Sequence, residues 1–127
     1  MYSAYKLTDQ ARNALLARFP AKHSKVIAHH VTFKFPSDIL PPDAETVDVI
    51  AEVFDEKVHA VMVKVNFPHG GKTLSPTGNV FHVTISVNQD NGGKPVMSNA
   101  LCKDQHDVFF DNDTIMTLDV VPSLLKF

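Results

Sequence analysis

Two segments of this chain alternate polar and apolar residues in the same way, at residues 28–35 and 80–87. In the first, His30 and Thr32 stand two residues apart within a β-branched and aromatic run, which is typical of a strand. Side chains on a strand alternate between its two faces, so these two residues share one face while Val31 lies on the other. The segment is therefore expected to present an imidazole and a hydroxyl on one side and to bury the other.

The second segment repeats this arrangement 52 residues later. His82 and Thr84 share one face of the expected strand, with Val83 and Ile85 on the other. The recurrence suggests two related halves, and two copies are too few for a repeat array.

The rest of the chain predicts one clear helix and several further strands. The helix begins after Thr8 at the N-cap and ends before Pro20, with Ala11, Leu15 and Phe19 along one side. The other expected elements are an edge strand at residues 2–7, the first motif strand at 26–35, a valine-rich hairpin of residues 46–54 and 58–67, the second motif strand at 80–87, a short helix from 95 to 102 and a last strand at 114–121.

Two loops separate these elements. Residues 36–43 contain consecutive prolines, which bar regular structure. Residues 68–79 are rich in glycine, serine and threonine and predict a long, mobile loop just before the second motif strand. Loops of this length in a compact domain are often functional, so a role near the motif is expected.

Strands outnumber helices and are joined by hairpin-type links, so the expected fold class is α+β with a mostly antiparallel sheet. The chain has 127 residues, of which 44% are hydrophobic and 20% charged. This composition fits a single domain over residues 1–127.

Charge and cysteine content restrict the setting and the partners. The formal net charge of −2 gives no general attraction to polyanions, so duplex DNA is not an expected partner. The single cysteine, Cys102, cannot form an internal disulfide, and the chain shows neither a signal-peptide pattern nor a membrane-spanning apolar run. A cytoplasmic protein without membrane contact is therefore expected.

Two His-x-Thr strands suit phosphodiester cleavage if the fold brings them together. This reaction needs a base for the attacking oxygen, an acid for the leaving oxygen and donors for the other phosphate oxygens. Histidine serves in both proton transfers because its ordinary pKa is about 6.5. A threonine hydroxyl donates to phosphate without adding charge.

At residues 26–32, 82–87 and 94–99 the chain resembles the 2H phosphoesterase superfamily, in particular its small RNA-repair-like branch. The resemblance extends from about residue 5 to residue 101. It implies a bilobal fold of two antiparallel sheets flanking a cleft, and hydrolysis of 2′,3′-cyclic phosphates without a metal or cofactor. Carried over to this chain, it implies the proton-transfer pair and the two phosphate-binding hydroxyls, which are His30 and His82 and Thr32 and Thr84.

Three further residues near the motifs are ambiguous. Lys34 shares the His30 face and Ser86 shares the His82 face, so both are candidates for binding the substrate phosphate. For Lys34, a solvated lysine at the strand end is the favoured explanation, and for Ser86 the alternative is that it only caps the polar stripe. His29 is expected on the opposite face from His30, in a packing role, unless a bulge exchanges the two.

The leading hypothesis is a metal-independent hydrolase for a 2′,3′-cyclic phosphate on a nucleotide or an RNA end, with a role in RNA processing. A second hypothesis keeps the site but takes cyclic di- or oligonucleotide signals, which viral members of the superfamily resemble in degrading. A third is a non-catalytic module that binds RNA ends or nucleotides. Bases would stack on aromatic side chains such as Phe81, Phe109 and Phe110. No metal-ligand pattern such as His-Glu-x-x-His or Cys-x-x-Cys occurs in the sequence.

Overall fold

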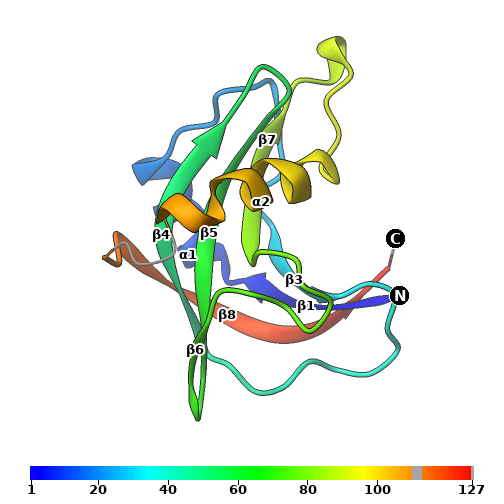
Figure 1. The fold of residues 1–127 in the computed structure, drawn as a ribbon, viewed down its shortest axis with the longest axis vertical. Coiled ribbons are helices and arrows are strands. Elements are labelled where there is room, and N and C mark those ends of the chain that lie inside the picture. Colours follow the sequence, from blue (N-terminus) through cyan, green and yellow to red (C-terminus); the bar gives the residue numbers. More distant parts are fainter. Residues whose placement is uncertain (110–112, 127) are drawn as a thin grey trace.

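The computed structural model describes residues 1–109 and 113–126. Within them the fold is α+β, as expected, and its strands form one antiparallel sheet (Figure 1). The elements in chain order are β1 (Tyr2–Leu7), α1 (Asp9–Arg18), β2 (Lys25–Val26), β3 (His30–Lys34), β4 (Thr46–Phe54), β5 (Val58–Phe67), β6 (Gly70–Lys72), β7 (His82–Val87), a 3-10 turn (Gln89–Asn91), α2 (Met97–Phe109) and β8 (Met116–Leu125).

The sheet closes on itself. Its strand order is β2-β7-β3-β1-β8-β4-β5-β6, and β7 pairs with β5 as well as with β3. Six strands therefore form a ring that runs β7, β3, β1, β8, β4, β5 and back to β7. The two sheets that the resemblance implies are thus continuous, because β7 hydrogen-bonds to a strand of each.

Apolar side chains fill the interior of this sheet, and the two helices cover it. Tyr5, Leu15 and Val63 belong to the main core, in which all three are fully buried. Helix α1 packs on β8 and β1, whereas α2 lies across β4, β5 and β7 (Figure 1). Under α2, a smaller cluster contains Met62 and Cys102, both also fully buried.

The hairpin and the first helix match the sequence prediction. Strands β4 and β5 pair antiparallel with the expected bounds. The odd-numbered residues from Val61 to Phe67 are buried in the main core, as predicted. Helix α1 is capped by Thr8, whose Oγ1 accepts a hydrogen bond from the Ala11 amide at 3.1 Å, which satisfies one of the free donors of the first turn.

The first motif strand is interrupted. Residues 26–35 do not form one strand, because β2 and β3 are separated by residues 27–29, where Ala28 adopts a positive φ of 44°. Both pieces still lie along the same edge of β7, with Val26 opposite Ser86 and Val31 opposite Val83. Six residues on one side, 26–31, therefore span four on the other, 83–86, which is a bulge immediately before His30.

Four other expectations need correction. β1 is an inner strand between β3 and β8 rather than an edge strand. Residues 68–79 are not an irregular loop, because β6 pairs with β5 and Leu74 bridges Val80. The second helix continues to Phe109, beyond its predicted end at Cys102. The last strand begins two residues later than predicted and runs through Pro122 to Leu125.

None of the helices in the described residues has the length and apolar character needed to cross a membrane.

Candidate active site

The fold places the two histidine motifs directly beside each other. β3 and β7 are antiparallel, and Val31 lies opposite Val83, the residue 52 positions later in the chain. One step outward from this pair, antiparallel geometry sets His30 across from Thr84, and Thr32 across from His82. Each histidine therefore faces the threonine of the other motif, and a local twofold axis relates the two motifs.

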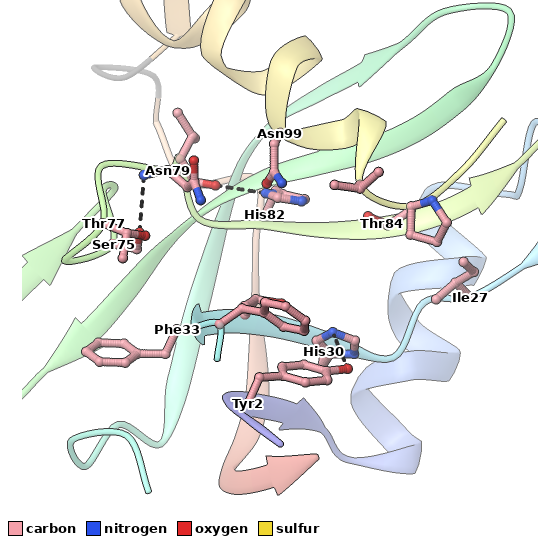
Figure 2. Close-up of a pocket in the computed structure, with 15 residues that line it drawn as sticks. Tyr2, Ile27, His30, Phe33, Ser75, Thr77, Asn79, His82, Thr84 and Asn99 are labelled. Carbon is pink, nitrogen blue, oxygen red and sulfur yellow. Dashed lines mark hydrogen bonds between the residues drawn. The ribbon is translucent and has the colours of Figure 1, made fainter. Parts of the chain in front are cut away.

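All four motif side chains line one cavity of about 550 Å³. In Figure 2, His30 and Tyr2 lie on one side of this cavity, with His82 and Asn99 on the other. The remaining lining residues come from β3 and the residues flanking it, from the segment before β7 and from the residues just before α2, and they are Ile27, Phe33, Phe35, Ser75, Thr77, Asn79, Val80, Pro95 and Val96.

A backbone carbonyl fixes the tautomer of His82. Its Nδ1 lies 2.8 Å from the carbonyl oxygen of Val80 (Figure 2). A carbonyl oxygen only accepts hydrogen bonds, so Nδ1 must carry the proton. In the neutral ring, Nε2 is then the nitrogen with the lone pair.

Both ring nitrogens of His30 have protein partners. Nε2 lies 3.3 Å from the Tyr2 hydroxyl, and Nδ1 lies 2.9 Å from Nδ1 of His29. The two imidazoles meet edge to face, with ring centroids 5.2 Å apart. One proton must lie between the two Nδ1 atoms for this contact to be a hydrogen bond, so the tautomers of His29 and His30 depend on each other.

Burial favours the neutral form of both motif histidines. It lowers the pKa of His30 to about 4, and the neighbouring imidazoles of His29 and His82 add to this effect. Burial also lowers the pKa of His82, although the hydrogen bond to the Val80 carbonyl opposes the change. An anionic phosphate in the cavity would raise both pKa values, because opposite charge favours the protonated ring.

A buried hydroxyl anchors Thr84. Its Oγ1 donates a hydrogen bond to Ser98 Oγ at 2.9 Å, and Ser98 is fully buried at the start of α2. In the next position, Asn99 reaches the cavity. The N-terminal end of α2 thus lies at the cavity, where the helix dipole favours an anion.

Two of the predicted phosphate contacts lie outside the cavity. Lys34, at the end of β3, is exposed and does not line the cavity, although Phe33 and Phe35 on either side of it do. Ser86 is fully buried toward the other end of β7, where its Oγ accepts the His23 amide at 3.1 Å and lies 3.5 Å from His59 Nδ1. No lysine or arginine is found among the described residues that line the cavity.

His29 also departs from the prediction that it packs on the opposite face. The positive φ at Ala28 turns the backbone so that the His29 ring lies against His30 instead. His29 does not itself line the cavity.

Sequence reasoning missed most of the cavity wall. The segment expected to be mobile contributes Ser75, Thr77 and Asn79. Ser75 Oγ accepts a hydrogen bond from the Asn79 backbone amide at 3.2 Å, and it shares one with the Thr77 hydroxyl at 3.0 Å. The polar, glycine-rich composition signalled a functional segment without identifying these residues. Nothing in the sequence pointed to Tyr2, which reaches His30 only because β1 pairs with β3.

Of the aromatic residues named for base stacking, the structure describes the side chain of Phe81, which does not line this cavity. Phe81 is 1% exposed and belongs to the core. Phe110 and the side chain of Phe109 lie outside what the structure describes. The cavity instead receives Tyr2, Phe33 and Phe35.

Comparison with known proteins identifies a family. A family model described as the fungal tRNA ligase phosphodiesterase domain matches residues 6–124, and this family is one of the 2H phosphoesterases. No curated protein and no solved structure matches the sequence. Among the described residues, no group of three or more His, Cys, Asp or Glu side chains is arranged to hold a metal ion.

Proposed function

We propose, because the chain belongs to the 2H phosphoesterase family of fungal tRNA ligase phosphodiesterase domains, that it hydrolyses the 2′,3′-cyclic phosphate of an RNA end or nucleotide without a metal. Membership of this family supports cyclic phosphodiesterase activity. The observation that carries the finer proposal is the pairing of β3 with β7, which lines one cavity with both histidines and both threonines.

His82 acts as the general base in this proposal. A water oxygen bonds to phosphorus while Nε2 of His82 takes one of its protons. The Val80 carbonyl, 2.8 Å from Nδ1, holds the ring in the required tautomer and stabilises the imidazolium that forms. A base oriented by an acceptor at its second nitrogen is the arrangement used in hydrolytic triads.

His30 acts as the general acid. Phosphate binding raises its pKa, and the protonated ring then donates its Nε2 proton to the ribose oxygen as the bond from phosphorus to that oxygen breaks. Tyr2, 3.3 Å from Nε2, gives up this contact when substrate enters. The products are a phosphomonoester and a free ribose hydroxyl, and the two rings exchange protons with solvent before the next cycle.

Thr32 and Thr84 bind the non-bridging phosphate oxygens. The Thr84 hydroxyl becomes a donor to phosphate when Ser98, 2.9 Å away, takes over as the donor between the two hydroxyls. The cavity is otherwise largely apolar on the side of Phe33 and Phe35, which suits the faces of a base.

Alanine substitution of each histidine tests the proposal. His30→Ala and His82→Ala should each lower kcat on nucleoside 2′,3′-cyclic phosphates by about 10²- to 10⁴-fold, the usual value of one acid or base. Wild-type activity should persist in excess EDTA. The matched control is His23→Ala, because the His23 ring contacts the Asp55 carbonyl at 3.0 Å and does not line the cavity.

Substrate identity is tested with the same proteins. A panel should pair cyclic-phosphate nucleotides and RNA ends with cyclic di- and trinucleotides. If only the cyclic di- or trinucleotides are hydrolysed, they are the substrates and the proposed substrate is wrong. Tight binding without any turnover would indicate a non-catalytic module. Wild-type rates in either histidine variant would overturn the assignment of these residues.

A further inference from the structure

A second, shallower groove adjoins the active-site cavity. It has a volume of about 360 Å³ and shares Phe33 and Ser75 with the first cavity. Its other lining residues come from β5, β6 and the loops beside them, and they are Pro42, Phe67, His69, Lys72, Leu74, Pro76 and Phe81. A bound nucleic acid strand that enters the active site can therefore continue into this groove along the protein surface.

Aromatic rings form the floor of the groove. Phe33 stacks on Phe81 with centroids 6.2 Å apart and an interplanar angle of 22°, and Phe67 lies 6.4 Å from Phe81. The exposed ring of His69 lies on Phe67, with centroids 5.7 Å apart and an interplanar angle of 10°. Stacking on Phe67 orients the His69 ring and presents a planar surface at the groove.

A tight turn positions His69. Phe67 pairs with Gly70, so only Pro68 and His69 connect β5 to β6. Proline fixes φ at the first turn position, and Gly70 has a φ of 134°, which is costly for other residues. The His69 ring is therefore held over the groove by the backbone of the hairpin.

Lys72 supplies the positive charge that the active-site cavity lacks. It is exposed on β6, it lines the groove, and it makes no ion pair with the described residues. A lysine beside a planar ring surface is the combination that proteins use to bind single-stranded nucleic acid, with the charge on the backbone and the ring under a base.

We infer that this groove binds the nucleotide that precedes the cyclic-phosphate-bearing nucleotide in an RNA chain. Its base stacks on His69 and its phosphate contacts Lys72, while the terminal nucleotide occupies the cavity lined by the two motifs. The inference rests on the proposed function, because it places the cyclic phosphate between His30 and His82. The protein should therefore prefer RNA ends to single nucleotides as substrates.

Kinetics with two substrates test the inference. The ratio of kcat/KM for the dinucleotide ApA ending in a 2′,3′-cyclic phosphate to that for adenosine 2′,3′-cyclic phosphate should exceed about tenfold, as expected for one stacked base. His69→Ala and Lys72→Ala should each lower this ratio about five- to tenfold. His69→Phe and Lys72→Arg should retain most of it, because they keep the ring surface and the charge.

Lys57→Ala is the matched control for the loss of a lysine. Lys57 lies just before β5, at the opposite end of the strand from Phe67 and roughly 30 Å away from it. Its removal should leave the ratio unchanged. The groove assignment would be overturned if the wild-type protein had equal kcat/KM values for the two substrates and neither His69→Ala nor Lys72→Ala had an effect. The proposed function would then still stand.

Equilibrium binding separates the two proposals if neither substrate is hydrolysed. In that case the hydrolase proposal fails, and the groove is tested with ApA and adenosine that carry a 2′- or 3′-phosphate on the terminal ribose. Tighter binding of the dinucleotide, lost in His69→Ala, supports the groove. Equal binding of the two ligands rejects it.

Discussion

At the residue scale, the chemistry of this protein depends on how His30 is surrounded. Its ring contacts His29 and Tyr2, and the His82 imidazole is near enough to lower its pKa. Such a site holds a neutral imidazole at low cost and a charged one at high cost. Substrate binding supplies the negative charge that offsets this cost, so the acid is formed where it is used.

The lowered pKa of His30 predicts that stability falls in acid. The unfolded ring binds a proton with a pKa of 6.5, whereas the folded ring does so only at about 4. Between these values the unfolded state binds more protons, so the free energy of unfolding decreases as pH falls, by about 3 kcal/mol at pH 4. His30→Gln should remove this part of the pH dependence in urea titrations at pH 7 and pH 4. An unchanged difference between the two pH values would mean that His30 is not the residue responsible.

The contact with His29 predicts a positioning role for that residue. His29→Ala removes the partner of His30 Nδ1, 2.9 Å away, and should lower kcat about fivefold, the value of one hydrogen bond. Because the His29 imidazole helps to lower the pKa of His30, its loss should also shift the pH profile of kcat/KM. His29→Asn keeps a short polar group that donates or accepts at this position, and should restore most of the rate. A purely structural role would change the melting temperature without moving the pH profile.

At the element scale, the decisive feature is the bulge between β2 and β3. Ala28 is fully buried with φ at 44°, a conformation that β-branched residues avoid. Ala28→Gly should keep both stability and activity. Ala28→Val should lower the free energy of unfolding by about 1–3 kcal/mol and lower kcat, because relief of the strain moves His30. Denaturation and kinetics on the same pair of variants check this, and equal behaviour of the two would show that the bulge does not set the position of His30.

The same bulge shows why local pattern predicts some elements and not others. The hairpin of β4 and β5 was predicted with its observed bounds, and helix α1 with its observed start and an end one residue too late, since periodicity and capping are properties of neighbouring residues. A positive φ at an alanine leaves no such signal, so residues 26–35 were predicted as a single strand.

The candidate site was predicted in part for the same reason. Alternation along each strand correctly predicted that each histidine shares a face with its threonine. Alternation does not tell where a cavity ends. It therefore could not show that Lys34 and Ser86 lie outside the cavity. Tyr2 and Asn99 reach the cavity through strand pairing and helix packing between distant segments, which the sequence does not display.

At the scale of the whole molecule, closure of the six-strand ring predicts cooperative unfolding. Both motif strands belong to the ring, and β7 pairs on both of its edges, so neither half of the chain separates without breaking sheet hydrogen bonds. Far-UV circular dichroism and catalytic activity should be lost in a single coincident transition in urea. Two separated transitions would show that the chain contains two independent units rather than one domain over residues 1–127.

The reciprocal facing of the motifs across the Val31 and Val83 pair also bears on the origin of this protein. Each motif carries one imidazole and one hydroxyl, and each histidine faces the threonine of the other strand. If the two halves arose by gene duplication, the single ancestral unit had only half of a site. It would have been active only as a homodimer, assembled about the axis that now passes between these two valines.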